Sequence, residues 1–147
     1  MQLYPNLSFD GCCEAAFYFY EQCLRGKIAF LLRYEASPMA SQAPPEWQKK
    51  IGHATFALGG FLFSGSDVLP GQYQKPQGFA LQLNLNDPRE AERIFDALAE
   101  NGTVQMPLQE TFWAGRFGSL VDQFGIPWLI NCEKPSMTGN PAPPSGA

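Results

Sequence analysis

One order of elements is predicted twice along the chain, and this internal repeat limits the folds that the chain can adopt. Alternating apolar residues, apolar helical faces and turn residues define these elements. In the first half they are a strand, a helix and three strands, at 3–9, 14–25, 27–34, 51–58 and 61–67. In the second half the same order returns, at 79–85, from Asp87 to Asn101, and at 103–108, 114–121 and 126–132. A duplicated supersecondary unit is therefore predicted.

The ends of both helices carry recognisable signals. Asp10 is predicted to cap the first helix, and Gly26 is predicted to end it in the left-handed conformation that glycine adopts freely. Asp87-Pro88-Arg89-Glu90 is a strong helix start, with Asp87 as cap and Glu90 reaching back to the cap residue. Asn101-Gly102 is predicted to close the second helix.

Strands that outnumber helices, joined by hairpins, favour an α+β fold with largely antiparallel sheets. Each half is a βαβββ module whose cupped sheet has one face without a helix, so two modules can close around a cleft. We expect a single domain over residues 1–134, with module one at 1–69 and module two at 78–134. The Pro/Gly/Ser-rich segment 135–147 is expected to be a flexible tail, and the proline-rich segment 35–50 a loop with one helical turn.

The composition argues against several classes of partner. The formal net charge is −4 and the basic residues are scattered, which argues against binding to nucleic acid or to an anionic membrane surface. No apolar stretch approaches the length of a membrane-spanning helix, and the N-terminus does not resemble a secretory signal. The four cysteines lack CxxC spacing and are expected to be reduced thiols. We therefore expect a cytoplasmic protein.

The stretch from Glu110 to Trp128 combines several aromatic residues with charged ones, which is typical of a concave binding site. Much of its aromatic mass must be core, since it spans two strands of the second module. The ligand-binding candidates that remain are Glu110, Trp113 and Arg116, facing His53 from the other half. Trp128 is expected in the core.

Each candidate also has a purely structural interpretation. His53, the single histidine of the chain, is either a hydrogen-bonded strand residue, a general base, or a ligand beside Glu110 or Asp67. Glu110 is either a solvated charge or a carboxylate whose pKa is raised by an apolar cleft. Arg116 is either exposed or an anion clamp. Cys12 and Cys13 are expected to be packing residues, although a first helical turn favours thiolate.

Four segments resemble the vicinal oxygen chelate superfamily, which includes glyoxalase I, extradiol dioxygenases and bleomycin-resistance proteins. They are YPNLSF (Tyr4 to Phe9), IGHATFALGG (Ile51 to Gly60), ETFW (Glu110 to Trp113) and DQFGIPWLIN (Asp122 to Asn131). More specifically, the chain resembles the PhnB-like branch, which is sometimes labelled 3-demethylubiquinone methyltransferase-like. This resemblance implies two βαβββ modules, a cupped sheet for a small ligand, and a homodimer.

The resemblance also implies where a metal would bind. Metal-using relatives hold a divalent ion with His and Glu side chains from facing strands. The matching positions here fall near Pro5, Phe63 or Ser64, Ala80 and Leu129, and none of these side chains suits a metal. No metal site and no cofactor are therefore expected, with a divalent metal as the alternative.

Three functional hypotheses follow. The first is a PhnB-like protein of unassigned physiological role that binds a small molecule in the cleft without the usual metal. The alternative is a metal-dependent lyase, isomerase or dioxygenase with a rearranged site that uses His53 with Glu110 or Asp67. The third is a structural dimer whose cleft is filled by its own aromatic side chains. Methyl transfer from S-adenosylmethionine is rejected, because neither strand-to-helix connection carries a Gly-rich loop.

Overall fold

The computed structural model describes residues 1–111 and 115–133. The chain divides into two compact units, of which the first comprises Met1–Pro76 with Phe124–Ile126 and the second comprises the remaining residues. Each unit is described by itself.

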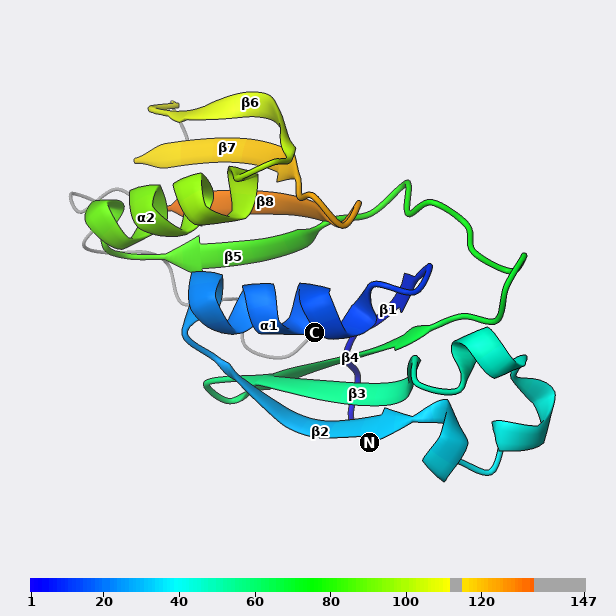
Figure 1. Cartoon of the computed structure of the whole chain (residues 1–147). Coiled ribbons are helices and arrows are strands. Elements are labelled where there is room, and N and C mark those ends of the chain that lie inside the picture. Colours follow the sequence, from blue (N-terminus) through cyan, green and yellow to red (C-terminus); the bar gives the residue numbers. More distant parts are fainter. Residues whose placement is uncertain (112–114, 134–147) are drawn as a thin grey trace. The chain divides into compact units, whose positions relative to one another are not determined.

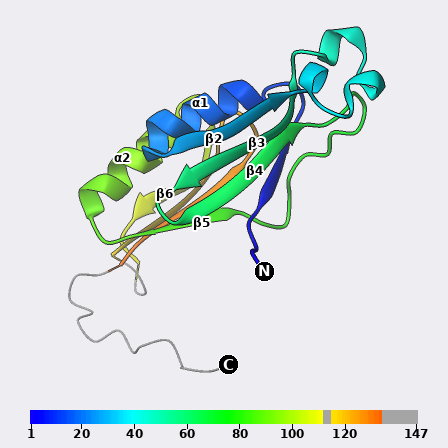
Figure 2. The same ribbon diagram turned by 90° about the horizontal axis from the view of Figure 1, so that it is seen from below.

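The first unit is a four-stranded sheet with one helix on one face (Figure 1). Its elements are β1 (Asn6–Phe9), α1 (Cys13–Leu24), β2 (Lys27–Arg33), β3 (Ile51–Leu58) and β4 (Phe61–Asp67). The strand order is β1-β4-β3-β2, in which β1 runs parallel to β4 and the other pairs are antiparallel. Three short 3-10 turns, η1 (Tyr34–Ala36), η2 (Ala40–Gln42) and η3 (Pro45–Trp47), gather at one end of this sheet (Figure 2).

Aromatic rings fill the space between α1 and its sheet. Phe17 of α1 meets Phe9 of β1, Phe56 of β3 and Phe63 of β4 edge to face, at centroid distances of 6.2, 6.0 and 5.6 Å. The rings of Phe56 and Phe63 stack on each other at 4.8 Å. Such pairs add to the free energy gained from burial alone, so these rings fix which face of the sheet carries the helix.

The second unit repeats the same topology. Its elements are β5 (Leu81–Leu85), α2 (Pro88–Ala99), β6 (Thr103–Gln109), β7 (Arg116–Val121) and β8 (Pro127–Cys132), in the order β5-β8-β7-β6. β5 is again parallel to the last strand of its unit, and the other pairs are antiparallel. The apolar face predicted for α2 is buried through Ala91, Ile94, Phe95 and Leu98. The α+β class and the two βαβββ modules are therefore confirmed.

The helix ends of the first unit correct two predictions. Asp10 does not cap α1, because the helix begins at Cys13 after a Cys12 cap residue without a side-chain hydrogen bond. Gly26 does not adopt the left-handed conformation, which Arg25 takes instead at φ 58°. Gly26 serves a steric purpose, since a Cβ there would lie 2.6 Å from the Ala57 carbonyl oxygen.

The second helix begins at the predicted position. The Asp87 side chain accepts a hydrogen bond from the Arg89 backbone N–H at 3.0 Å, which confirms the cap. Glu90 also forms an ion pair with Arg93 at 2.6 Å. Asn101 takes the left-handed conformation at φ 58°, and Gly102 follows it at a point of close contact with the Val121 carbonyl.

Element boundaries differ from the predictions by a few residues. β1 and β5 begin at Asn6 and Leu81, later than predicted, and the segment 35–50 holds more helical turns than the one expected. The predicted tail at 135–147 lies outside the described residues. No helix in the described part of the chain is long and apolar enough to cross a membrane.

Candidate functional site

The helix-free face of the first sheet carries a set of polar side chains. Ala54, Phe56, Phe63 and Gly65 point towards α1, as the ring contacts and the approach of Phe17 to Gly65 show. Because side chains alternate along a strand, their neighbours point to the opposite face. On β1, β3 and β4, the polar residues of this face are Asn6, Ser8, His53, Thr55, Ser64 and Ser66. We call this set the first open face.

His53 lies on the first open face and is exposed. Its Nε2 atom is 3.4 Å from the Thr55 hydroxyl, and its ring centroid is 5.9 Å from that of Phe30 in β2. On the neighbouring strands, the Ser64 hydroxyl donates a 2.7 Å hydrogen bond to the Asn6 side-chain oxygen. The face therefore offers an imidazole, hydroxyls and an amide, all of which can donate or accept hydrogen bonds.

The equivalent face of the second sheet carries amides. Side chains of Gln82, Asn84, Ser119 and Asn131 lie opposite to the residues that contact α2. The Asn84 Oδ1 atom accepts hydrogen bonds from Gln82 at 2.8 Å and from Asn131 at 3.1 Å. Among the described residues, the buried Oδ1 atom of Asn131 has no hydrogen-bond partner.

Asp67 is placed differently from His53. It lies at the end of β4 on the side of α1 and is 1% exposed. Its Oδ1 atom accepts the Cys13 backbone N–H at 2.9 Å, and its Oδ2 atom accepts the Ile51 backbone N–H at 2.8 Å. Burial raises the pKa of Asp67, while these hydrogen bonds and the charge of Lys50 oppose the shift. Asp67 thus joins the start of α1 to the start of β3.

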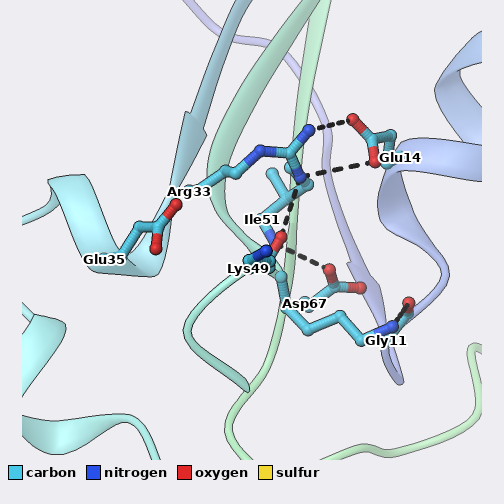
Figure 3. A pocket seen from close by; sticks show the side chains of 8 residues that line it. Gly11, Glu14, Arg33, Glu35, Lys49, Ile51 and Asp67 are labelled. Atoms are coloured by element: carbon cyan, nitrogen blue, oxygen red, sulfur yellow. Dashed lines mark hydrogen bonds and ion pairs between the residues drawn. The ribbon is translucent and has the colours of Figure 1, made fainter. Parts of the chain in front are cut away.

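The Asp67 carboxylate also lines a cavity of about 550 Å³ in the first unit (Figure 3). The other charged residues that line it are Glu14, Arg33, Glu35, Lys49 and Lys50. They come from α1, the end of β2, η1 and the segment before β3, which are distant in sequence. The sequence predicted none of these five as site residues, because no local motif joins them.

The remaining predicted site residues belong to the second unit. Arg116 forms a 2.9 Å ion pair with Glu92 of α2, so its guanidinium lies on the helix side of the second sheet. Glu110 follows β6 and is exposed. Trp113 lies outside the described residues.

Buried groups in the same segments have structural partners. The indole N–H of Trp128 donates to the Asp122 carboxylate at 2.9 Å, and the two residues are 2% and 3% exposed. This confirms Trp128 as a core residue. Burial raises the pKa of the Cys12 and Cys13 thiols, which supports their role as packing residues.

The residues at the superfamily's metal positions do not fit a divalent ion. Phe63 packs against Phe17, so Ser64 is the residue of that pair that reaches the first open face. The Ser64 hydroxyl already donates to Asn6, and proline, alanine and leucine at positions 5, 80 and 129 bring no ligand atoms. In the described part of the chain, no three His, Cys, Asp or Glu side chains are grouped as a metal site would require.

Two βαβββ units with helix-free sheet faces define the class of glyoxalase and bleomycin-resistance folds. A glyoxylase/bleomycin resistance protein/dioxygenase domain from Frankia sp. EAN1pec shares this fold, with a TM-score of 0.61 at 13% identity over 91% of this chain and 98% of that chain.

The family is defined by closer comparisons. The model of the family described as 3-demethylubiquinone-9 3-methyltransferase matches residues 1–131, and the chain belongs to this family. Protein YjdN from Escherichia coli (strain K12) is 36% identical over 146 residues, which cover 94% of this chain and 99% of that protein. The crystal structure of protein PA1353 from Pseudomonas aeruginosa matches with a TM-score of 0.83 and 43% identity, over 90% of this chain and 98% of that chain. The PhnB-like resemblance is thereby confirmed.

Proposed function

We propose that this protein binds a small polar molecule on the first open face, with His53 as a central contact and without a resident metal ion. The observation that carries the proposal is the gathering of six polar side chains from three adjacent strands on the helix-free side of one sheet. A sheet face that only packs into a protein core is lined by apolar side chains. Six polar side chains on one face therefore favour a binding role. The ligand would contact hydroxyls, an amide and an imidazole together.

The chemistry of this face favours a neutral, hydrogen-bonding ligand. Asn6, Ser8, Thr55, Ser64 and Ser66 carry no charge, and none is an acid or a strong base. Phe30 beside His53 adds an apolar ring against which a flat part of the ligand can pack. Few polar groups with one aromatic wall are typical of a site that orients a ligand by hydrogen bonds.

The methyl-transfer activity in the family description is not part of this proposal. The connections before α1 and α2 read SFDGCC and NLNDP, and neither has the glycine spacing of a loop that cradles a nucleotide-like cofactor. The α2 start is capped by Asp87 and the α1 start by Asp67, so a protein carboxylate accepts an N-terminal amide hydrogen bond of each helix.

The metal-dependent alternative ranks second because of the positions of its ligands. His53 lies on the first open face, while Asp67 points to the α1 side of the same sheet and accepts two backbone hydrogen bonds. These two side chains cannot share one ion without breaking the Asp67 contacts. The alternative would therefore depend on His53 with Glu110.

The proposal is tested by screening the protein with small polar compounds in ligand-observed NMR, and by metal analysis of the purified protein. Compounds that bind should lose binding to His53→Ala and keep it with Gln105→Ala, an exposed residue of β6. One tightly bound divalent ion per chain, with lyase or dioxygenase turnover, would overturn the proposal in favour of the alternative. Equal binding by wild type and His53→Ala would remove His53 from the site.

A further inference from the structure

The lining of the charged cavity in the first unit (Figure 3) includes none of the residues of the first open face. Asp67 and Arg33 reach it from the α1 side of the sheet, where Arg33 contacts Glu14 of α1. The proposed function uses none of these residues. A volume of about 550 Å³ is large enough for a compound of metabolite size.

Most of the charged groups in this cavity are held in place by the protein. The two terminal nitrogens of Arg33 contact the Glu14 carboxylate at 3.4 and 2.6 Å, and one of them also donates to the Lys49 carbonyl at 2.8 Å. The Lys50 ammonium donates to the Gly11 carbonyl at 2.9 Å and lies 5.9 Å from the Trp47 ring centroid. Asp67 is held by two backbone amides. The cavity therefore has a preformed set of fixed charges.

Two charged side chains of opposite sign on the rim of the cavity, Glu35 and Lys49, are not held by such contacts. Among the described residues, the Glu35 carboxylate and the Lys49 ammonium have no hydrogen-bond or ion-pair partner, and both residues are exposed. The charge of Glu35 raises the pKa of Arg33, although Glu14 has the larger effect. The Glu35 carboxylate therefore acts electrostatically on a residue that lines the cavity. Together with the fixed groups, the lining carries three cationic and three anionic side chains.

We propose that this cavity binds a small zwitterion of the amino-acid class. The ligand ammonium pairs with Glu35, and the ligand carboxylate pairs with Lys49 and with the N–H donors that Arg33 has not used for Glu14 and Lys49. An arginine guanidinium has five such donors. A lining of balanced formal charge favours a ligand that carries both signs, because a purely anionic or cationic compound leaves one of the rim charges without a partner.

Binding at this cavity is expected to be weak and dependent on salt. Glu35 and Lys49 are exposed, and ion pairs in contact with water gain little because the solvent screens them. The fixed arginine reduces the ordering cost on the protein side. A dissociation constant in the millimolar range, rising with ionic strength, is the expected result.

The test is an NMR titration of the full chain, labelled with ¹⁵N, that follows the backbone amides of Gly11 and Ile51. The probes are L-alanine and L-glutamine, with propionate and ethylamine as compounds that carry only one of the two charges. The expected result is a saturating shift with an amino acid and none with either single-charge compound at the same concentration. Equal shifts with propionate or ethylamine, or no shift with either amino acid, would overturn the proposal.

Matched variants separate this cavity from the first open face. Glu35→Gln and Lys49→Gln are each expected to weaken amino-acid binding about fivefold, while Glu46→Gln, in η3 outside the cavity lining, should leave it unchanged. His53→Ala should also leave amino-acid binding unchanged. A negative result for the first open face can therefore be told apart from a negative result for this cavity. Unchanged binding by both Glu35→Gln and Lys49→Gln would contradict the proposed contacts.

Discussion

The two units of this chain share one topology but start their helices in different ways. In the second unit, α2 is capped by Asp87, the residue directly before the helix. In the first unit, the cap of α1 comes from Asp67, which accepts the Cys13 N–H from 54 residues away and also the Ile51 N–H. The local cap stabilises one helix end, whereas the distant cap joins α1, β3 and β4. Two units of the same topology can therefore take the cap of the equivalent helix from different parts of the chain.

Among substitutions that test this comparison, we expect the largest loss of stability at Asp67. Asp67→Ala leaves two buried backbone N–H groups without an acceptor, and each was bonded to a charged group. We expect a loss of about 3 kcal/mol or more in the free energy of unfolding, measured by urea denaturation. Asp10→Ala is the matched control, since Asp10 is exposed and does not cap α1, and should change stability by less than about 0.5 kcal/mol. Similar losses for both variants would refute the distant cap.

A second prediction concerns the glycine that follows each helix. At Gly102 the nearest atoms to an added Cβ all belong to the backbone of Val121 and Asp122, which cannot easily move. At Gly26 the nearest atoms include the ring of Phe56. Gly102→Ala is expected to lower the free energy of unfolding by about 2 kcal/mol, and Gly26→Ala by a similar or smaller amount. Thermal unfolding of both variants checks this, and a stabilised Gly102→Ala protein would be inconsistent with the close approach.

The third prediction is a smaller effect at the local cap. Asp87→Ala removes one hydrogen bond at an exposed helix end, so we expect a loss of about 1 kcal/mol. Asp96→Ala, an exposed residue on the same helix, serves as control. If the distant cap is the stronger one, Asp67→Ala lowers the free energy of unfolding clearly more than Asp87→Ala does in the same urea series. A reversed order would show that the distant cap is the weaker one.

The smallest expected effect is on the pH dependence of stability. Burial raises the pKa of Asp67 above its ordinary value of 3.8, so the folded protein keeps this proton at pH values where the unfolded chain has lost it. Its contribution to stability is therefore fully present below pH 3.8 and is lost as the pH rises through the folded pKa. A carboxyl ¹³C titration of Asp67 should show a midpoint above 3.8. A midpoint below this value would mean that the amide hydrogen bonds outweigh burial.

The features that could be predicted from the sequence are those that depend on neighbouring residues. The βαβββ repeat, the Asp87 cap and the apolar face of α2 follow from local periodicity and turn chemistry. The Asp67 cap could not be predicted, because a contact across 54 residues leaves no local pattern. Gly26 was misinterpreted for the same reason, since its Cβ space is taken by β3.

The candidate site was predictable only in part. His53 could be singled out as the one histidine of the chain, and its strand was placed correctly. The accompanying serines were missed, although alternation in the Ser64-Gly65-Ser66 segment shows that Ser64 and Ser66 share a face. The charged cavity could not have been predicted, because its lining requires the packing of α1 against the ends of β2 and β4.

The most direct test of the proposed function follows the His53 imidazole itself. Its ring ¹H–¹³C signals can be recorded while the protein is titrated with a small polar compound that binds in the screen. The proposal predicts a saturating shift of the His53 signals that follows the same binding curve as the compound, and loss of that curve in His53→Ala. A compound that binds with the same affinity while the His53 signals stay in place would contradict the assignment of the ligand site to the first open face.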